Sequence, residues 1–208
     1  MTGSMVLLVE GRDDQRVVDR ICREHGVPCP NVEYRGSDAD LLQEFSTQLK
    51  VLGKEDAEDV LGVVIDADTS ATNRWQSLRD RLGNAGYQEI PRQPEPGGTI
   101  VSPAAEELSP KVGIWIMPNN QDSGELEDFL AFLVPDSDSH WQHAESCVDS
   151  LNQPLFRPVD RSKAIIHTWL AWQADPGLPF GTAIQSRFLD PNAPHARQLV
   201  HWLRELFG

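Results

Sequence analysis

The chain has 208 residues, enough for one sizeable core, and two independent domains are not expected. Its formal net charge of -14 repels nucleic-acid phosphates, so a phosphate substrate would need a metal ion or a local basic patch. The few scattered cysteines exclude a disulfide framework or a zinc-site spacing, and no apolar run reaches the roughly 20 residues of a membrane span, so we expect a cytoplasmic protein without membrane contact.

Strand and helix signals alternate four times along the first part of the chain. The predicted strands cover residues 5–9, 31–35, 61–66 and 111–118. The first helical pattern ends near Gly26, and the others lie at residues 37–53, 73–86 and 123–134. Apolar runs favour buried strands, whereas apolar residues three and four apart favour amphipathic helices. Residues 91–110 are rich in Pro and Gly and predict a loop or β-hairpin insertion.

This alternation predicts an α/β fold, a Rossmann-like and mostly parallel four-stranded sheet with helices on both faces. After Pro135 the pattern changes to helices alone, at residues 140–151, 161–174 and 195–207. The predicted organisation is therefore an α/β domain over residues 1–135, and a helical extension over residues 136–208 that packs on it.

Acidic residues follow two of the predicted strands. Glu10 comes directly after the first strand, and Asp66 and Asp68 close the third with one residue between them. Residues i and i+2 of a strand point to the same side, so both Asp carboxylates can reach one point if the extended geometry persists through Asp68. Carboxylates this close repel unless they take up a proton or a cation, and oxygen ligands favour Mg²⁺ or Mn²⁺. The alternative is that Asp68, Thr69 or Ser70 merely caps the next helix.

A further acidic cluster opens the helix after the fourth strand. If that helix begins near Gly124, Glu127 lies in its first turn, close to the predicted edge of the sheet. We expect Glu125 and Asp128 to complement the helix dipole, and Glu127 to contribute to the metal site.

An acid closing the first strand in "LLVEGRDD" and a DxD closing the third in "VVIDADTS" resemble the Toprim domain of topoisomerases, primases and OLD-family nucleases. The resemblance covers roughly residues 5–135, and the whole chain looks like stand-alone Toprim-related proteins of prokaryotes. It implies that Glu10 acts as general acid/base or metal ligand and that Asp66 and Asp68 bind Mg²⁺. Similarity to OLD-family nucleases implies that a Glu opening a helix and a downstream Lys assist the metals. By position these are Glu127 and Lys163.

The resemblance does not extend to every Toprim activity. Transesterification needs a nucleophilic Tyr, and neither Tyr34 nor Tyr87 stands in a telling context. A primase would need a zinc module and a basic template groove, and the sequence shows neither. We therefore expect Mg²⁺-dependent phosphodiester hydrolysis or phosphoryl transfer on nucleic acid, as in a nuclease.

Two other functions stay open. The domain could be a non-catalytic binding or regulatory protein whose partner supplies the basic surface, which the acidic composition favours. The apolar strand with DxD is also similar to the first motif of haloacid-dehalogenase-type phosphatases, in which Asp66 would be a nucleophile. That family usually has Thr where Ser70 stands. The compact basic group near the predicted site, Arg157, Arg161 and Lys163, is a candidate for contacts with phosphate.

Overall fold

The computed structural model describes residues 3–28, 30–52, 58–104 and 108–208. Its centre is a five-stranded sheet in the order β2-β1-β3-β5-β4. The strands are β1 (Met5–Val9), β2 (Asn31–Tyr34), β3 (Val60–Asp66), β4 (Thr99–Val101) and β5 (Lys111–Met117). All neighbouring pairs are parallel except β4 with β5. The predicted mostly parallel α/β fold is thus confirmed, with one strand more than expected.

The additional strand comes from the predicted insertion at residues 91–110. Its β-branched run Thr99–Val101 pairs antiparallel with β5, and Ile100 lies opposite Gly113. A short antiparallel strand suits this position, because it closes the edge of an otherwise parallel sheet. Residues 105–107 of the insertion lie outside the described part of the chain.

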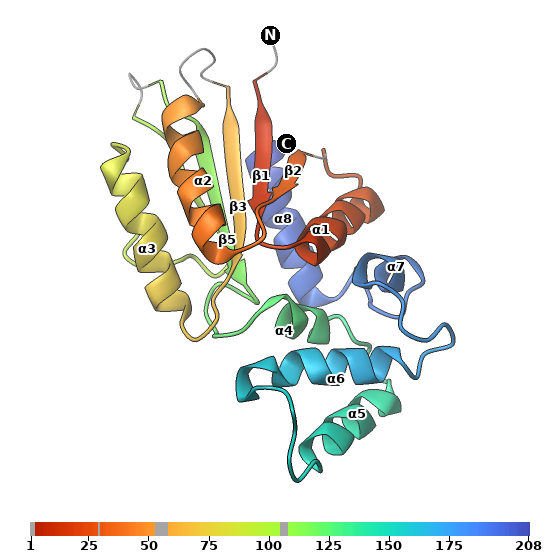
Figure 1. Cartoon of the computed structure of the whole chain (residues 1–208). Coiled ribbons are helices and arrows are strands. Elements are labelled where there is room, and N and C mark those ends of the chain that lie inside the picture. Colours follow the sequence, from red (N-terminus) through yellow and green to blue (C-terminus); the bar gives the residue numbers. More distant parts are fainter. Residues whose placement is uncertain (1–2, 29, 53–57, 105–107) are drawn as a thin grey trace.

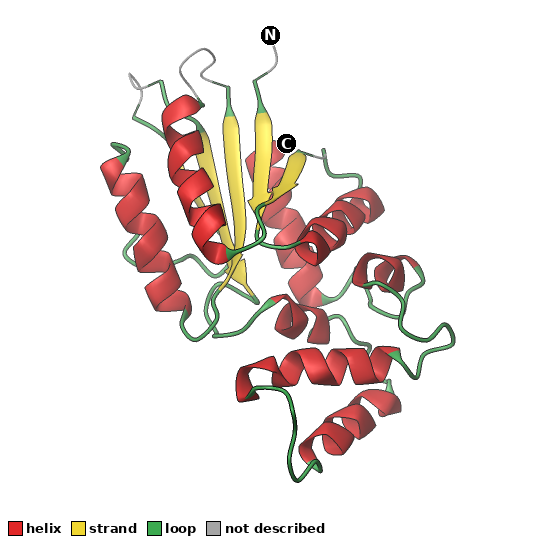
Figure 2. Cartoon of the chain, in the orientation of Figure 1, coloured by secondary structure: helices red, strands yellow, loops and turns green. Residues whose placement is uncertain are grey.

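Helices cover both faces of the sheet, as predicted (Figures 1 and 2). One apolar cluster joins the sheet to α2 (Asp38–Val51) and α3 (Ala71–Asn84). The other joins the opposite face to α1 (Arg12–His25) and α8 (Pro194–Phe207), and extends into the remaining helices. Alternate residues of β3 therefore belong to different cores, as the period of two in a strand requires. Gly53, the expected end of the second helix, is outside the described residues.

The C-terminal helix lies against the middle of the sheet. Gly62 of β3 and Gly113 of β5 are register partners, and a Cβ at Gly113 would lie 2.3 Å from Cδ2 of Leu206. The paired glycines let α8 approach the sheet closely, and Trp202, Leu206 and neighbouring apolar side chains fill this contact. The last part of the predicted extension thus completes one layer of the α/β unit.

The rest of the C-terminal segment lies at the edge where β1, β3 and β5 end (Figure 1). It follows α4 and consists of four short elements. The helices around this edge are α4 (Leu126–Ala131), α5 (Ser139–Asp149), the 3-10 turn η1 (Pro158–Asp160), α6 (Arg161–Leu170) and α7 (Phe180–Gln185). The sequence patterns did not predict α7. Among the helices that the structure describes, none has the length and apolar character needed to cross a membrane.

Candidate functional site

An acidic cavity of about 300 Å³ opens at the carboxyl edge of the sheet. The loops after β1 and β2, the end of β3, the starts of α1 and α4, and part of α6 line it. Six carboxylates line it, those of Glu10, Asp13, Asp14, Asp66, Glu125 and Glu127. Arg12, Lys163 and His167 are its basic lining residues.

Strand pairing brings Glu10 and Asp66 to the same edge. Val9, the last residue of β1, pairs with Val64 of β3, and Asp66 ends β3 two residues later. The turn after β1 is held by a hydrogen bond of 2.8 Å from the backbone N–H of Gly36 to the carbonyl oxygen of Glu10. Both predicted acids therefore enter the cavity from neighbouring strand ends, as the parallel topology requires.

Asp14 joins them from the first turn of α1, and the sequence analysis did not single it out. Its Oδ2 accepts a hydrogen bond of 3.1 Å from the backbone N–H of Gly11, which caps the helix. The side chain is buried, with 6% exposure, and its Oδ1 has no hydrogen-bond partner among the described residues. The signal for Asp14 was its place four residues after Glu10, but that spacing also fits an ordinary helix-capping acid.

Glu127 and Lys163 meet across the opposite wall. Glu127 is buried in the first turn of α4, as predicted, and its Oε1 lies 3.2 Å from Nζ of Lys163 on α6. Lys163 also lies 3.7 Å from Oε2 of Glu125. Asp128 instead caps α4, because its Oδ2 accepts from the backbone N–H of Glu125 at 2.8 Å. The structure thus brings the predicted pair Glu127 and Lys163 together, although no local pattern connects them.

Burial and mutual repulsion make the cavity acids weak. Burial, followed by the charges of Asp14 and Glu10, raises the pKa of Asp66 to about 9. Burial and the nearby charges of Asp14 and Asp68 raise the pKa of Glu10 to about 7. The pKa of Asp14 rises to about 6, because burial outweighs its backbone hydrogen bonds. Without a cation, the carboxyl group of Asp66 therefore holds a proton at neutral pH.

The pKa of Lys163 is raised by the acids on its own side of the cavity. Burial alone would lower its pKa, but the charges of Glu127 and Glu125 and the hydrogen bond to Glu127 raise the pKa above its ordinary value. The ammonium group therefore stays charged and offsets part of the negative charge of the cavity.

Asp68 differs from the prediction. The strand ends at Asp66, and Asp68 has a φ of 51°, because its backbone exchanges hydrogen bonds of 3.0 and 2.9 Å with Gly124. The alternation of side chains stops there, so the two Asp side chains do not continue one strand face. Asp68 lines a neighbouring hollow and pairs with Arg74. Ser70, not Asp68, caps α3 by accepting from the backbone N–H of Asn73.

The predicted basic group is neutralised by nearby acids. Arg157 pairs with Asp160 at 2.7 Å, and Arg161 pairs with Asp149 at 2.7 Å. Since Lys163 faces Glu127, each of the three cations has a carboxylate partner.

The donors of the cavity suit a hard divalent cation. Oε2 of Glu10, Oδ1 of Asp14 and Oδ1 of Asp66 are buried and lack hydrogen-bond partners among the described residues. A buried acceptor without a partner is costly, and a cation would satisfy all three. Across the described ranges, no group of three or more His, Cys, Asp or Glu side chains already stands in a metal-binding arrangement. Binding would therefore require these side chains to rotate towards a common point.

Comparison with known proteins identifies the family of this chain. Residues 4–208 match the family model described as "Protein of unknown function (DUF3226)". The comparisons with curated proteins and with solved structures give no match. Since the matched region includes every strand of the sheet and every acid of the cavity, the chain belongs to the DUF3226 family.

Proposed function

We propose that the protein catalyses Mg²⁺- or Mn²⁺-dependent phosphodiester hydrolysis, or a related phosphoryl transfer, on nucleic acid. The observation that carries this proposal is the set of three buried carboxylate oxygens without partners, on Glu10, Asp14 and Asp66, in one cavity. A protein gains nothing in stability from burying such groups unless a cation or a proton satisfies them. The resemblance to Toprim domains supports the same reading for Glu10 and Asp66.

The proposed ligands of the metal ion are Asp14, Asp66 and Glu127. When bound, such a cation stabilises the charge that develops on a transferring phosphoryl group and lowers the pKa of a water molecule. Glu10, on the adjacent strand end, serves as a further ligand or as the base that takes a proton from the attacking water. Asp68 could add a ligand only after its ion pair with Arg74 opens.

Lys163 supports the reaction as the cation that remains at the rim. The side chain that carries its ammonium group is about half exposed, at 48%, whereas the side chain of Glu127 is 8% exposed. The exposed part of the group can donate to a phosphate oxygen while the Glu127 contact holds the side chain in place. Lys163 thereby lowers the repulsion between the acidic cavity and an incoming phosphate.

The test uses the purified full-length protein with labelled single- and double-stranded DNA and RNA. We expect cleavage with Mg²⁺ or Mn²⁺ and none with EDTA. Asp66→Asn and Glu10→Gln should each lower the rate by about 100-fold or more, in the range of lost acid–base or metal-ligand function. Asp175→Asn, an exposed acid that does not line the cavity, should keep the wild-type rate. Cleavage that survives EDTA, or an active Asp66→Asn protein, would contradict the proposal.

The same proteins distinguish catalysis from a purely binding or regulatory role. Mg²⁺ or Mn²⁺ could raise the melting temperature of the wild type but not of Asp66→Asn, while every nucleic acid stays intact. The cavity would then bind a metal ion without catalysing hydrolysis of nucleic acid. That result would favour a regulatory protein over a nuclease.

A further inference from the structure

A second charged feature begins at the acidic cavity and runs along α1. Arg12, Arg16, Arg20 and Arg23 follow one another at intervals of four, four and three residues. At 3.6 residues per turn these side chains occupy one face of the helix, which we call the arginine face. The buried residues of α1, such as Val17 and Ile21, face the core instead. Four arginines therefore share one face of α1, a helix that also carries Asp13, Asp14, Asp19 and Glu24.

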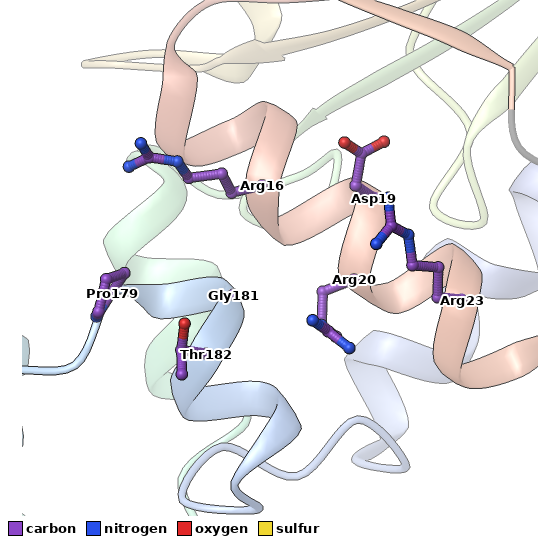
Figure 3. Close-up of a pocket in the computed structure, with 7 residues that line it drawn as sticks. All are labelled: Arg16, Asp19, Arg20, Arg23, Pro179, Gly181 and Thr182. Atoms are coloured by element: carbon purple, nitrogen blue, oxygen red, sulfur yellow. The ribbon is translucent and has the colours of Figure 1, made fainter. Parts of the chain in front are cut away.

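The arginine face forms one wall of a hollow of about 410 Å³ between α1 and α7 (Figure 3). Arg16, Arg20 and Arg23 line it from α1, and Gly181 and Thr182 line it from α7. The two helices approach closely because residue 181 is a glycine: a Cβ there would lie 3.0 Å from the carbonyl oxygen of Arg16. In Figure 3 the guanidinium group of Arg20 is directed towards α7. The hollow is thus a preformed concave site and not an open helix surface.

The acids near the hollow pair with its arginines only through exposed or long contacts. Asp19 also lines it, but Figure 3 shows its carboxylate directed away from α7. Arg16 lies 3.2 Å from Asp13 in a pair whose side chains are both more than half exposed. Arg20 is 3.8 Å from Glu24, which also pairs with Arg187.

Exposed or long ion pairs of this kind exchange readily for a better anion. Within the described residues Arg23 forms no ion pair at all. The three guanidinium groups can therefore turn to a ligand in the hollow.

We infer that the arginine face binds consecutive phosphate groups of a polynucleotide backbone and leads the strand to the acidic cavity. Arg12 connects the two sites, since it lines the acidic cavity and belongs to the arginine face. Its guanidinium carbon stands 4.9 Å from the ring centre of Tyr34, so stacking holds it at this junction. The inference rests on the proposed function, because phosphodiester hydrolysis in the acidic cavity is the reason to expect a phosphodiester chain as the ligand.

The length of the face favours a chain over a small anion. Arg23 lies eleven positions after Arg12, which at 1.5 Å per residue is roughly 16 Å along the helix. A nucleic-acid strand carries a phosphate about every 3.4 Å of duplex axis, so the face spans about five phosphates of one strand. A single inorganic phosphate would engage the hollow alone and would leave Arg12 unused.

The experiment measures binding separately from cleavage. Fluorescence anisotropy with labelled DNA and RNA strands in EDTA, between about 50 and 200 mM salt, gives the affinity and its salt dependence. The test variant combines Arg16→Gln, Arg20→Gln and Arg23→Gln, because Gln keeps the helix propensity of Arg. A control removes the same charge from exposed basic residues outside α1, with Lys50→Gln, Arg92→Gln and Arg197→Gln.

We expect the test variant to bind at least about tenfold more weakly, and its slope of log K against log salt to fall by about 2, or roughly 0.7 per lost contact. The control should stay within about twofold of the wild type, because steering by net charge is weak in moderate salt. Lys at the three positions should restore most of the slope, since phosphate contacts need the charge more than the guanidinium fork. Equal losses in test and control variants, or a wild type that binds no polynucleotide, would overturn the inference.

Hydrolysis of bis(4-nitrophenyl) phosphate with Mn²⁺ separates this inference from the proposed function. This small diester can occupy the acidic cavity without reaching Arg16, Arg20 or Arg23, which line the separate hollow. If Asp66→Asn loses this activity while the arginine variant binds DNA and RNA as the wild type does, the function stands and the inference is wrong. If binding depends on the arginines but no hydrolysis occurs, the function is wrong and the binding surface stands.

Discussion

Replacing Asp66 by Asn should stabilise the metal-free protein, although Asp66 lies at the centre of the candidate site. Burial and the neighbouring acids raise the pKa of Asp66 from 3.8 to about 9. At pH 7 the unfolded chain has this group ionised, so folding without a metal must bind a proton. About three pKa units separate pH 7 from 3.8, and each is worth about 1.4 kcal/mol. Protonating Asp66 on folding therefore costs at most about 4 kcal/mol of stability.

Asn has a similar shape and needs no proton, so Asp66→Asn removes this cost. We expect a gain of roughly 2 to 4 kcal/mol in the free energy of unfolding in EDTA at pH 7. For a chain of this length that is roughly 5 to 15 °C in melting temperature. Circular dichroism on heating, with EDTA present, measures it, and Asp175→Asn serves as the exposed control that should not shift.

Adding the metal ion should reduce or reverse the difference in stability between Asp66→Asn and the wild type. At a concentration of about 100 times Kd, Mg²⁺ or Mn²⁺ stabilises the wild type by about 2.7 kcal/mol and should leave Asp66→Asn unchanged. The melting temperatures of the two proteins therefore converge or cross when EDTA is replaced by metal. A variant that melts below the wild type in EDTA would refute the reasoning, because it would mean that Asp66 is ionised and satisfied in the metal-free fold.

Three further predictions follow from the same geometry. The raised carboxyl pKa values make the folded state bind more protons than the unfolded state, so the stability of the metal-free protein should fall as the pH rises from about 4 to about 9. Asp66→Asn should show a flatter profile. Thermal melts across this pH range test the direction of the change. Lys163→Met should destabilise the metal-free protein by roughly 1 kcal/mol, since it leaves Glu127 buried beside other acids. Urea titration measures this loss, and Lys163→Arg is the control that retains the charge. Gly113→Ala should cost about 1 to 3 kcal/mol, because its Cβ would meet Leu206 at 2.3 Å. If this contact is the cause, Gly113→Ala should cost less in the Leu206→Ala background than in the wild type, which a double-mutant cycle measures.

The sequence by itself determined the four parallel strands of the sheet and half of the candidate site. Uninterrupted apolar runs such as Val60–Ile65 report a strand buried on both faces, and such strands occur in parallel sheets covered by helices. Parallel strands end at one edge, so the positions of Glu10 and Asp66 in the chain were enough to bring them together. Period and topology are local or nearly local properties, and a single sequence carries them.

The tertiary structure alone decided the contacts between distant segments. The pairing of Lys163 with Glu127, the turn that diverts Asp68, and the hollow between α1 and α7 each depend on how packed elements meet. Likewise, Oδ1 of Asp14 becomes a candidate metal ligand only because the other walls of the cavity surround it. No periodic pattern predicts such contacts, because they arise from the packing of side chains that are far apart along the chain.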